Sequence, residues 1–222
     1  MSFPVTSQPP QAYSRLCESL ASRGDEPAVS TLLGELTRAL AASRPRGVFL
    51  CLGRGAGEMA TWIFDAMDLS GRLVVVVQDN REAGELRALL ADDMRVTVHV
   101  QDPVAFLSDV RDHRFDLITD LTPPKGTDPG RLALARLALG AFYLSLHGAR
   151  ELADILSVED GVAPGEEAAL DANSFAFAQL PAELAVSLMV RGPHRVQGKR
   201  RGGRRARQGV TPLFASRFPR GR

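Results

Sequence analysis

The run Val48-Phe49-Leu50-Cys51-Leu52-Gly53-Arg54-Gly55-Ala56-Gly57 decides the fold. Its first five residues are apolar and predict a buried strand that breaks into a glycine-rich turn, and residues 58–67 predict a helix. Gly53 and Gly55 carry no Cβ, so the backbone can turn sharply there and approach a ligand closely. The run therefore predicts a nucleotide-cofactor loop, with a purely structural turn as the alternative.

The spacing of the glycines narrows the choice of cofactor. A dinucleotide-binding turn has glycine at its first, third and sixth positions, and the sixth position here is Glu58. An acid at that position would face the pyrophosphate at the helix N-terminus, which disfavours NAD. S-adenosylmethionine has no phosphate, so it tolerates an acid at the start of this helix.

The composition is that of one ordinary globular domain. The chain has 222 residues, of which 45% are hydrophobic and 24% are charged. Cys17 and Cys51 have no spacing typical of a disulfide framework or a metal site, which fits a reducing cytoplasm. The start of the chain lacks the pattern of a secretory signal. The most apolar run, residues 132–146, is too short to span a bilayer. We therefore expect a cytoplasmic protein with no membrane partner.

The charge is divided unequally along the chain. Residues 191–222 hold 11 of the 27 lysines and arginines and none of the 26 acids, so this segment carries +11 and the preceding chain −10. Glycines and prolines are spread among its arginines, a composition that does not bury enough apolar surface to fold alone. We expect a disordered N-terminus at 1–12, a folded domain at 13–190 and a disordered basic tail at 191–222.

Apolar runs alternate with helical patterns along the folded domain. We expect helices at 13–22, 28–43, 58–67, 81–91, 103–110, from Asp128 and Pro129 to Gly140, and at 149–156, and strands at 48–52, 72–78, 96–100, 115–119, 141–146, 174–180 and 183–190. A tight turn containing Pro181 joins the last two strands as an antiparallel hairpin. The expected fold class is α/β, a three-layer Rossmann-like sandwich whose seven-stranded, mostly parallel sheet ends in that hairpin.

Ligands of such sheets bind beyond the carboxyl ends of the strands. This rule places the Gly53 turn, Asp79, Asp102 and Asp120 on one rim of the molecule. These positions form the candidate site.

With this order of elements, the chain resembles the class I S-adenosylmethionine-dependent methyltransferases, and within them the small O-methyltransferases of the catechol-type branch. The similarity extends over about residues 25–190. The segments that carry it are Leu50 to Gly57 with Thr61-Trp62-Ile63, Gly71 to Asp79, Val96 to Asp102 with Phe106-Leu107, and Phe115 to Ile118. The resemblance implies S-adenosylmethionine as the cofactor.

In that family an acid at the end of the second strand binds both ribose hydroxyls. The alignment puts Val77 at this position, so the role would fall to Gln78 or Asp79. Asp79 is equally suited to cap the helix that follows. Cys51 stands where the family has an acid before its glycines, which removes a partner for the loop backbone or for the amino group of the cofactor's methionine.

Asp102 matches the acid that receives the exocyclic amine of adenine in the family. The residue after it often donates its backbone N–H to the adenine ring, but Pro103 has no N–H. Asp102 and Pro103 also suit the N-cap and first turn of a helix, and this structural interpretation stays open. The cofactor contacts that the resemblance implies are Gly53, Arg54, Gly55, Gln78, Asp79, Asp102 and Asp120.

The acceptor side of the site has fewer signals. Metal-dependent members of the branch place several carboxylates after the fourth strand, whereas Asp120 has no second or third acid downstream, so we expect no metal site. Residues 122–125 match two of the four positions of a motif with which amino-methyltransferases hold a target nitrogen, and a proline-stiffened loop is the favoured alternative. Among the four histidines, His147 at the end of the fifth strand is the best candidate for a general base, with an exposed turn residue as the alternative.

Three functions follow from these observations. The first is methyl transfer from S-adenosylmethionine to a small-molecule hydroxyl without a metal, which depends on positioning more than on a dedicated catalytic residue. The second is a catalytically silent binding protein, motivated by the departures at Cys51, Val77 and Pro103. The third is a nucleic-acid-associated methyltransferase or binder that uses residues 191–222 to attract phosphate, against a solvated tail that balances an acidic body. Aminopropyl transfer is a remote fourth option, and the oligomeric state is not encoded in any recognisable pattern.

Overall fold

The computed structural model describes residues 8–90, 93–122, 129–147, 149–157, 174–181 and 186–193. Its strands are β1 Val48–Leu52, β2 Arg72–Val77, β3 Val96–Val100, β4 Phe115–Asp120, β5 Leu137–Ser145, β6 Phe175–Gln179 and β7 Ser187–Arg191. Its helices are α1 Gln11–Ser22, α2 Thr31–Ala42, α3 Ala56–Ala66, α4 Asn80–Leu90, α5 Pro103–Asp109, α6 Gly130–Ala135 and α7 Ala149–Ser157. None of the described helices is both long and apolar enough to cross a membrane.

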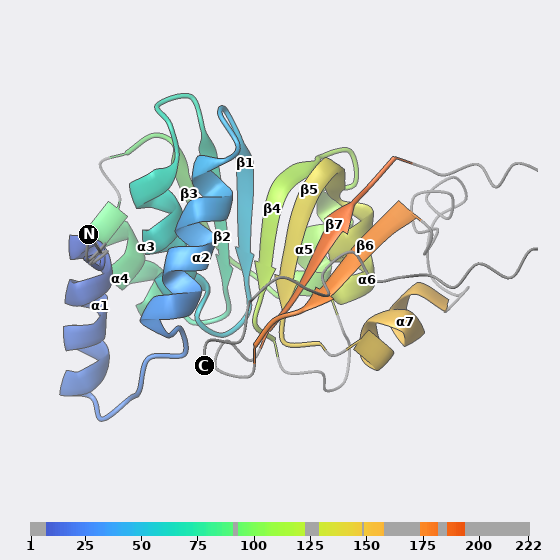
Figure 1. The fold of residues 1–222 in the computed structure, drawn as a ribbon. Helices are drawn as coiled ribbons and strands as arrows, with labels where there is room; N and C mark the ends of the chain where they lie inside the picture. The colour runs from blue at the N-terminus through green and yellow to red at the C-terminus, as the bar shows by residue number, and fades with distance from the viewer. Residues whose placement is uncertain are drawn as a thin grey trace, which may run out of the picture.

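All seven strands belong to one sheet with the order β3-β2-β1-β4-β5-β7-β6 (Figure 1). The first five strands are parallel, and β7 pairs antiparallel with both β5 and β6. The predicted fold class, with its crossovers first and its hairpin last, is confirmed. Pro181 lies in the described part of the hairpin connection, and residues 182–185 lie outside it.

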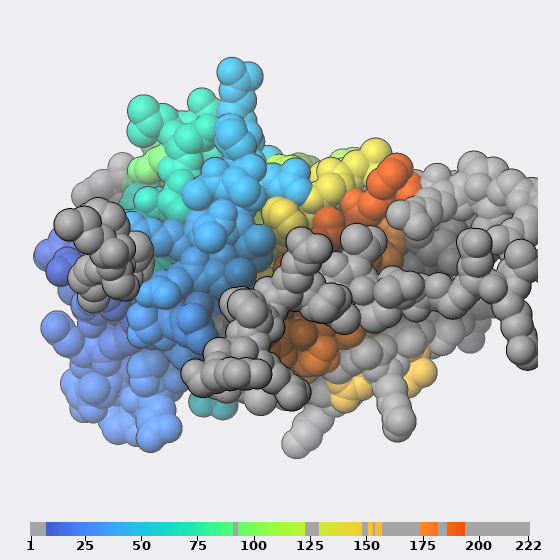
Figure 2. All heavy atoms as spheres, viewed as in Figure 1, coloured from blue at the N-terminus to red at the C-terminus, as the bar shows by residue number. Residues whose placement is uncertain are grey.

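Helices cover both faces of the sheet, so the central strands are apolar on both sides. Along β1, Phe49 and Cys51 pack with α1 to α4 in one core cluster. Leu50 and Leu52 point to the other face and belong to a second cluster with α5 to α7. This alternation explains why the five residues of β1 read as a continuous apolar run. In Figure 2, α1 and α2, in blue, cover the left part of the visible surface.

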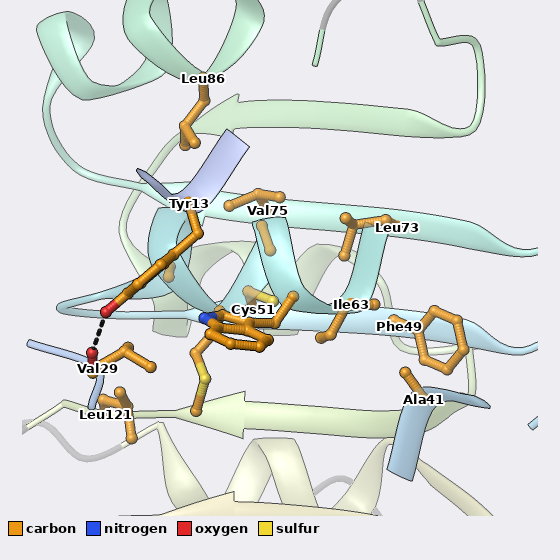
Figure 3. Packing of buried hydrophobic residues seen from close by; sticks show 14 of the residues in the cluster. Tyr13, Val29, Ala41, Phe49, Cys51, Ile63, Leu73, Val75, Leu86 and Leu121 are labelled. Atoms are coloured by element: carbon orange, nitrogen blue, oxygen red, sulfur yellow. Dashed lines mark hydrogen bonds between the residues drawn. The ribbon is translucent and has the colours of Figure 1, made fainter. Parts of the chain in front are cut away.

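The first cluster is organised around α3, which lies between the sheet and the first two helices (Figure 3). The Tyr13 hydroxyl donates a hydrogen bond to the Val29 carbonyl at 2.6 Å and so joins α1 to the segment before α2. The Tyr13 ring lies 5.2 Å from that of Trp62, centre to centre. Because Trp62 is fully buried, its indole fixes how closely α2 can approach α3.

The helix predicted from Pro129 to Gly140 was wrong in its second half. α6 ends at Ala135, and β5 begins at Leu137 instead of residue 141. Leu137 pairs with Phe115, and the register of β5 then shifts before Phe142 pairs with Leu117. Gly140 has φ +76°, so it permits an irregularity within the strand instead of ending a helix. Tertiary pairing with β4 overrides the local helical pattern here.

The other predicted elements are found within a few residues of their expected bounds. α2 begins at Thr31 instead of residue 28, because the Ser30 side chain accepts a hydrogen bond from the Leu33 N–H and caps the helix there. α1 starts at Gln11, two residues before its expected start. Asp128, the expected cap of the sixth helix, lies outside the described residues, and Pro129 occupies the N-cap position of α6.

Two glycines on helices give a matched test of this packing. A Cβ on Gly34 of α2 would lie 2.1 Å from the Trp62 ring, whereas a Cβ on Gly84 of α4 would meet nothing within 4 Å. We expect Gly34→Ala to lower the free energy of unfolding by about 3 kcal/mol, because the buried ring must move. We expect Gly84→Ala to raise it by about 0.5 to 1 kcal/mol, because alanine is the better helix former. Urea unfolding of both variants measures this difference, and equal effects would contradict the packing of α2 on α3.

Candidate functional site

The strand order reverses between β1 and β4, where connections run to opposite sides of the sheet. Such a switch point opens a crevice beyond the carboxyl ends of the strands. A cavity of about 390 Å³ lies there, a size typical of small-molecule sites. It is lined by Gly53, Arg54, Val76, Gln78, Asp79, Glu82, Asp102, Pro103, Val104, Thr122 and Pro129. We call it the crevice cavity.

The glycine-rich turn after β1 forms one wall of the crevice cavity. Gly53 and Gly55 have φ of +73° and +74°, the left-handed region that glycine adopts without strain. A Cβ on Gly53 would lie 2.2 Å from Thr122 Oγ1, so the turn passes directly against the end of β4. Gly55 is the N-cap residue of α3. Both glycines are therefore required by the backbone itself.

Polar side chains at the ends of β2 and β3 form the opposite wall. Gln78 and Asp79 follow β2 directly, and the Gln78 amide donates to Asp102 Oδ2 at 3.4 Å. Asp102 Oδ1 accepts the N–H groups of Val104 and Ala105, both at 3.0 Å, and so caps α5. Asp79 Oδ1 accepts the Arg81 N–H at 2.9 Å. The capping interpretation of both aspartates is confirmed, and both still line the cavity.

Two of the predicted cofactor contacts lie outside the crevice cavity. Gly55 lines a neighbouring cavity of about 240 Å³ between α1, the segment before α2 and the starts of α3 and α4. This cavity shares Arg54, Asp79 and Glu82 with the first. Asp120 is fully buried beneath the rim. Its placement by the carboxyl-end rule was right for the backbone, but its side chain turns into the protein.

The Asp120 carboxylate is bound by groups from the ends of β4 and β5. Asp120 Oδ1 accepts the Thr122 N–H at 3.0 Å, and Oδ2 accepts the Tyr143 hydroxyl at 3.0 Å. Burial raises the pKa of Asp120, while these hydrogen bonds and the charge of His147 act in the opposite direction. His147, expected on the active rim, is buried as well. Asp120 thus fixes the backbone of Thr122, which forms part of the cavity wall.

Solved structures share the fold, although no protein-family model and no curated protein matches the sequence. A methyltransferase from Geobacter sulfurreducens is 21% identical, with 85% of this chain and 92% of that one covered and a TM-score of 0.63. A second neighbour is the O-methyltransferase TomG from Streptomyces achromogenes, involved in tomaymycin synthesis and solved in complex with SAM. It is 18% identical, with 85% of this chain and 93% of that one covered and a TM-score of 0.63. An O-methyltransferase from Bacillus cereus, solved in complex with SAH, is 16% identical, with 85% of this chain and 94% of that one covered and a TM-score of 0.61.

The chain has the fold of the class I S-adenosylmethionine-dependent methyltransferases. Within this methyltransferase fold, two of the three departures noted in the sequence face the core. Cys51 is fully buried, which raises the pKa of its thiol to about 12. Val77 packs in the same cluster as Cys51. Pro103 is the departure that lines the crevice cavity.

Glu58 has a structural role that the sequence did not reveal. Its carboxylate accepts the N–H groups of Ala28 at 3.1 Å and Val29 at 2.8 Å. Burial raises its pKa, and the two backbone N–H groups act against that shift. The acid at the sixth position of the turn therefore anchors the segment before α2 to the start of α3.

Sequence reasoning missed Glu82 as a lining residue of the methyltransferase-fold crevice, and it named Thr122 only as the start of the 122–125 run, for which a stiffened loop was favoured. Glu82 lies in the first turn of α4, whose N-terminus faces the rim, and burial raises its pKa. Thr122 follows the end of β4 by two residues, so the end of that strand could have pointed to it. Residues 123–125 of the proline-containing run lie outside the described part of the chain. No group of three or more His, Cys, Asp or Glu side chains suited to a metal ion occurs among the described residues.

The buried Asp120 gives a pH-dependent test of the site. With its pKa raised above 3.8, the folded protein keeps a proton on Asp120 that the unfolded chain has released, so the stabilisation is lost as the pH rises through the window between the two values. We expect the difference in unfolding free energy between the native protein and Asp120→Asn to fall with rising pH, by up to about 1.4 kcal/mol per pH unit.

Urea unfolding at a series of pH values measures this difference, and the contributions of Glu58 and Glu82 cancel in it. Tyr143→Phe serves as the matched variant. It removes the hydroxyl donor to Asp120, so it should move the window to higher pH. A difference that does not change with pH would show that Asp120 is not perturbed as described.

Proposed function

We propose that the protein is an S-adenosylmethionine-dependent methyltransferase that methylates a hydroxyl of a small molecule without a metal. One observation carries the proposal: a single cavity brings together the Gly53 turn, the residues after β2 and Asp102. These three segments come from different parts of the sequence, and the fold neighbours solved with SAM or SAH support S-adenosylmethionine as the ligand that we propose for the cavity.

The residues of the crevice cavity fit this cofactor. Gly53 adds no side chain to the turn that borders the cavity, and the methionine portion would lie against its backbone, beside Arg54. Gln78 and Asp79 offer an amide and a carboxylate for the ribose hydroxyls. Asp79 Oδ1 caps α4 through the Arg81 N–H, and Oδ2 would exchange its 3.9 Å ion-pair contact with the exposed Arg81 Nε for the ribose. Asp102 Oδ2 would exchange its long contact with Gln78 for the exocyclic amine of adenine. Oδ1 of Asp102 would keep capping α5.

When bound, the cofactor would supply a methyl group on a sulfonium for direct displacement by the acceptor oxygen. The protein's part is to hold the cofactor and the acceptor in line and to exclude water. Holding the reacting groups in line by itself lowers the reaction barrier substantially. Thr122 follows β4, which lies on the other side of β1 from β2 and its Gln78, and an acceptor would enter beside it. Asp120, by holding the Thr122 N–H, is a positioning residue for this side.

Calorimetric titration with S-adenosylmethionine and with S-adenosylhomocysteine tests the proposal. Asp102→Ser keeps an N-cap for α5 but withdraws the carboxylate from the cavity. We expect this variant to bind both ligands about tenfold to a hundredfold more weakly, because a hydrogen bond to a charged group is lost. Asp112→Ser, an exposed position in the loop after α5, should bind like the native protein.

Absence of binding of either ligand to the native protein would overturn the cofactor assignment. It would favour the second candidate, a catalytically silent binding protein. The specific observation behind this candidate is that Pro103 lines the cavity at the position where an N–H to adenine is expected. Turnover with any acceptor would exclude it.

The third candidate assigns residues 191–222 to nucleic acid, supported by their charge of +11. A chain ending at residue 193 should then lose retention on RNA or DNA at low salt while its titration with S-adenosylhomocysteine stays unchanged. Equal retention with and without the tail would remove this candidate.

A further inference from the structure

The sheet has a second edge, at the amino-terminal ends of its parallel strands and opposite the crevice cavity. An arginine stands at or just before the start of each parallel strand, and β7 ends on this edge with Arg191, whose guanidinium donates to the Leu137 carbonyl. In Figure 1 this is the upper edge. We define the arginine rim as Arg44, Arg46, Arg72, Arg95, Arg111, Arg114 and Arg191. Arg136, before β5, is buried and not part of it.

Three of the described acids on this edge are engaged in internal contacts. Asp68 accepts the N–H groups of Arg46 and Ser70, and Asp93 forms an ion pair with Arg95. Asp116 accepts the Val48 N–H, and Asp112 is a further exposed acid in the loop before β4. Among the described residues, no carboxylate forms an ion pair with the other six arginines of the rim. Seven arginines stand against these four aspartates, so the described residues of this edge carry a net positive charge.

The most exposed large apolar side chains of the described residues lie on the same edge. Met94 is 97% exposed, Leu69 87% and Leu139 68%. Leu69 lies between α3 and β2, and Met94 lies before β3. The Arg95 guanidinium joins these two loops by donating to the Asp68 carbonyl. Leu139 projects from the irregular start of β5, beside Gly140. Figure 2 shows the segments that lead into β1 and β2 projecting at the upper edge.

We propose that the arginine rim docks on an anionic lipid surface. Guanidinium groups bind phosphate with two parallel hydrogen bonds, and nearby apolar side chains gain free energy by leaving water for the acyl boundary. A second copy of the chain that docked through the same rim would place arginine against arginine. Against nucleic acid, Leu69, Met94 and Leu139 would stay in water, and among described residues the one exposed Phe, Tyr or Trp is Phe177 on β6.

The sequence beyond the rim adds to this attraction. After Arg191, residues 192–222 contain ten more lysines and arginines and no acid. Such a polybasic segment strengthens binding to an anionic leaflet. The proposal replaces the sequence-based expectation of no membrane partner with a contact that needs no spanning helix. Because the crevice cavity lies on the opposite edge, a docked protein would keep it open to water.

Vesicle flotation of the full chain tests the proposal, with vesicles of phosphatidylcholine alone and with about one third phosphatidylglycerol. We expect binding to the anionic vesicles only. Leu69→Ser, Met94→Ser and Leu139→Ser together should weaken binding about tenfold or more. Arg72→Gln, Arg111→Gln and Arg114→Gln together should weaken it about tenfold to a hundredfold. All six side chains are exposed.

The matched control combines Leu32→Ser on α2 with Arg15→Gln on α1, two exposed positions away from the rim, and should bind like the native chain. Circular dichroism checks that every variant is folded. Native protein that binds neither kind of vesicle, or binds both equally, would overturn the proposal. So would rim variants that bind like the control, since the tail alone would then account for binding. Binding of a duplex RNA that the rim variants lose, without vesicle binding, would assign the rim to nucleic acid instead.

Discussion

The turn after β1 can pass against Thr122 because residue 53 has no side chain. This contact joins the ends of the two strands between which the order of the sheet reverses, and both residues form part of the wall of the crevice cavity. The buried Asp120 carboxylate accepts a hydrogen bond from the Thr122 N–H, and the Tyr143 hydroxyl donates to Asp120 in turn. The wall is thus set by backbone and buried polar groups, which leaves the exposed side chains around it available for a ligand.

Several residues of the site serve the fold and the cavity together. Asp102 caps α5 with one oxygen and lines the cavity with the rest of its carboxylate. Glu58 fixes the segment that leads into α2 and lines the neighbouring cavity. A structural interpretation and a functional one therefore need not compete at one residue, because a carboxylate has two oxygens and can serve both.

Much of the fold could be predicted from the sequence, and the failures have physical causes. The apolar run of β1 with its glycines and the strand–helix alternation up to β4 predicted the sheet, because local pattern and tertiary pairing agree there. Local pattern and tertiary pairing disagree at Leu137, which has the spacing of a helical residue but pairs with β4 as part of β5. The positions of Gln78, Asp79 and Asp102 beside the crevice cavity could be predicted, because each residue directly follows the carboxyl end of its strand. The inward turn of Asp120 did not, because side-chain direction depends on Tyr143, 23 residues later.

A crystal structure with S-adenosylhomocysteine would test the central claim most directly. The account predicts the ligand in the crevice cavity, with its amino-acid portion along the Gly53 turn, its ribose at Gln78 and Asp79, and its adenine beside Asp102 and Pro103. A ligand bound elsewhere, or a crevice cavity left empty at saturating ligand, would contradict it.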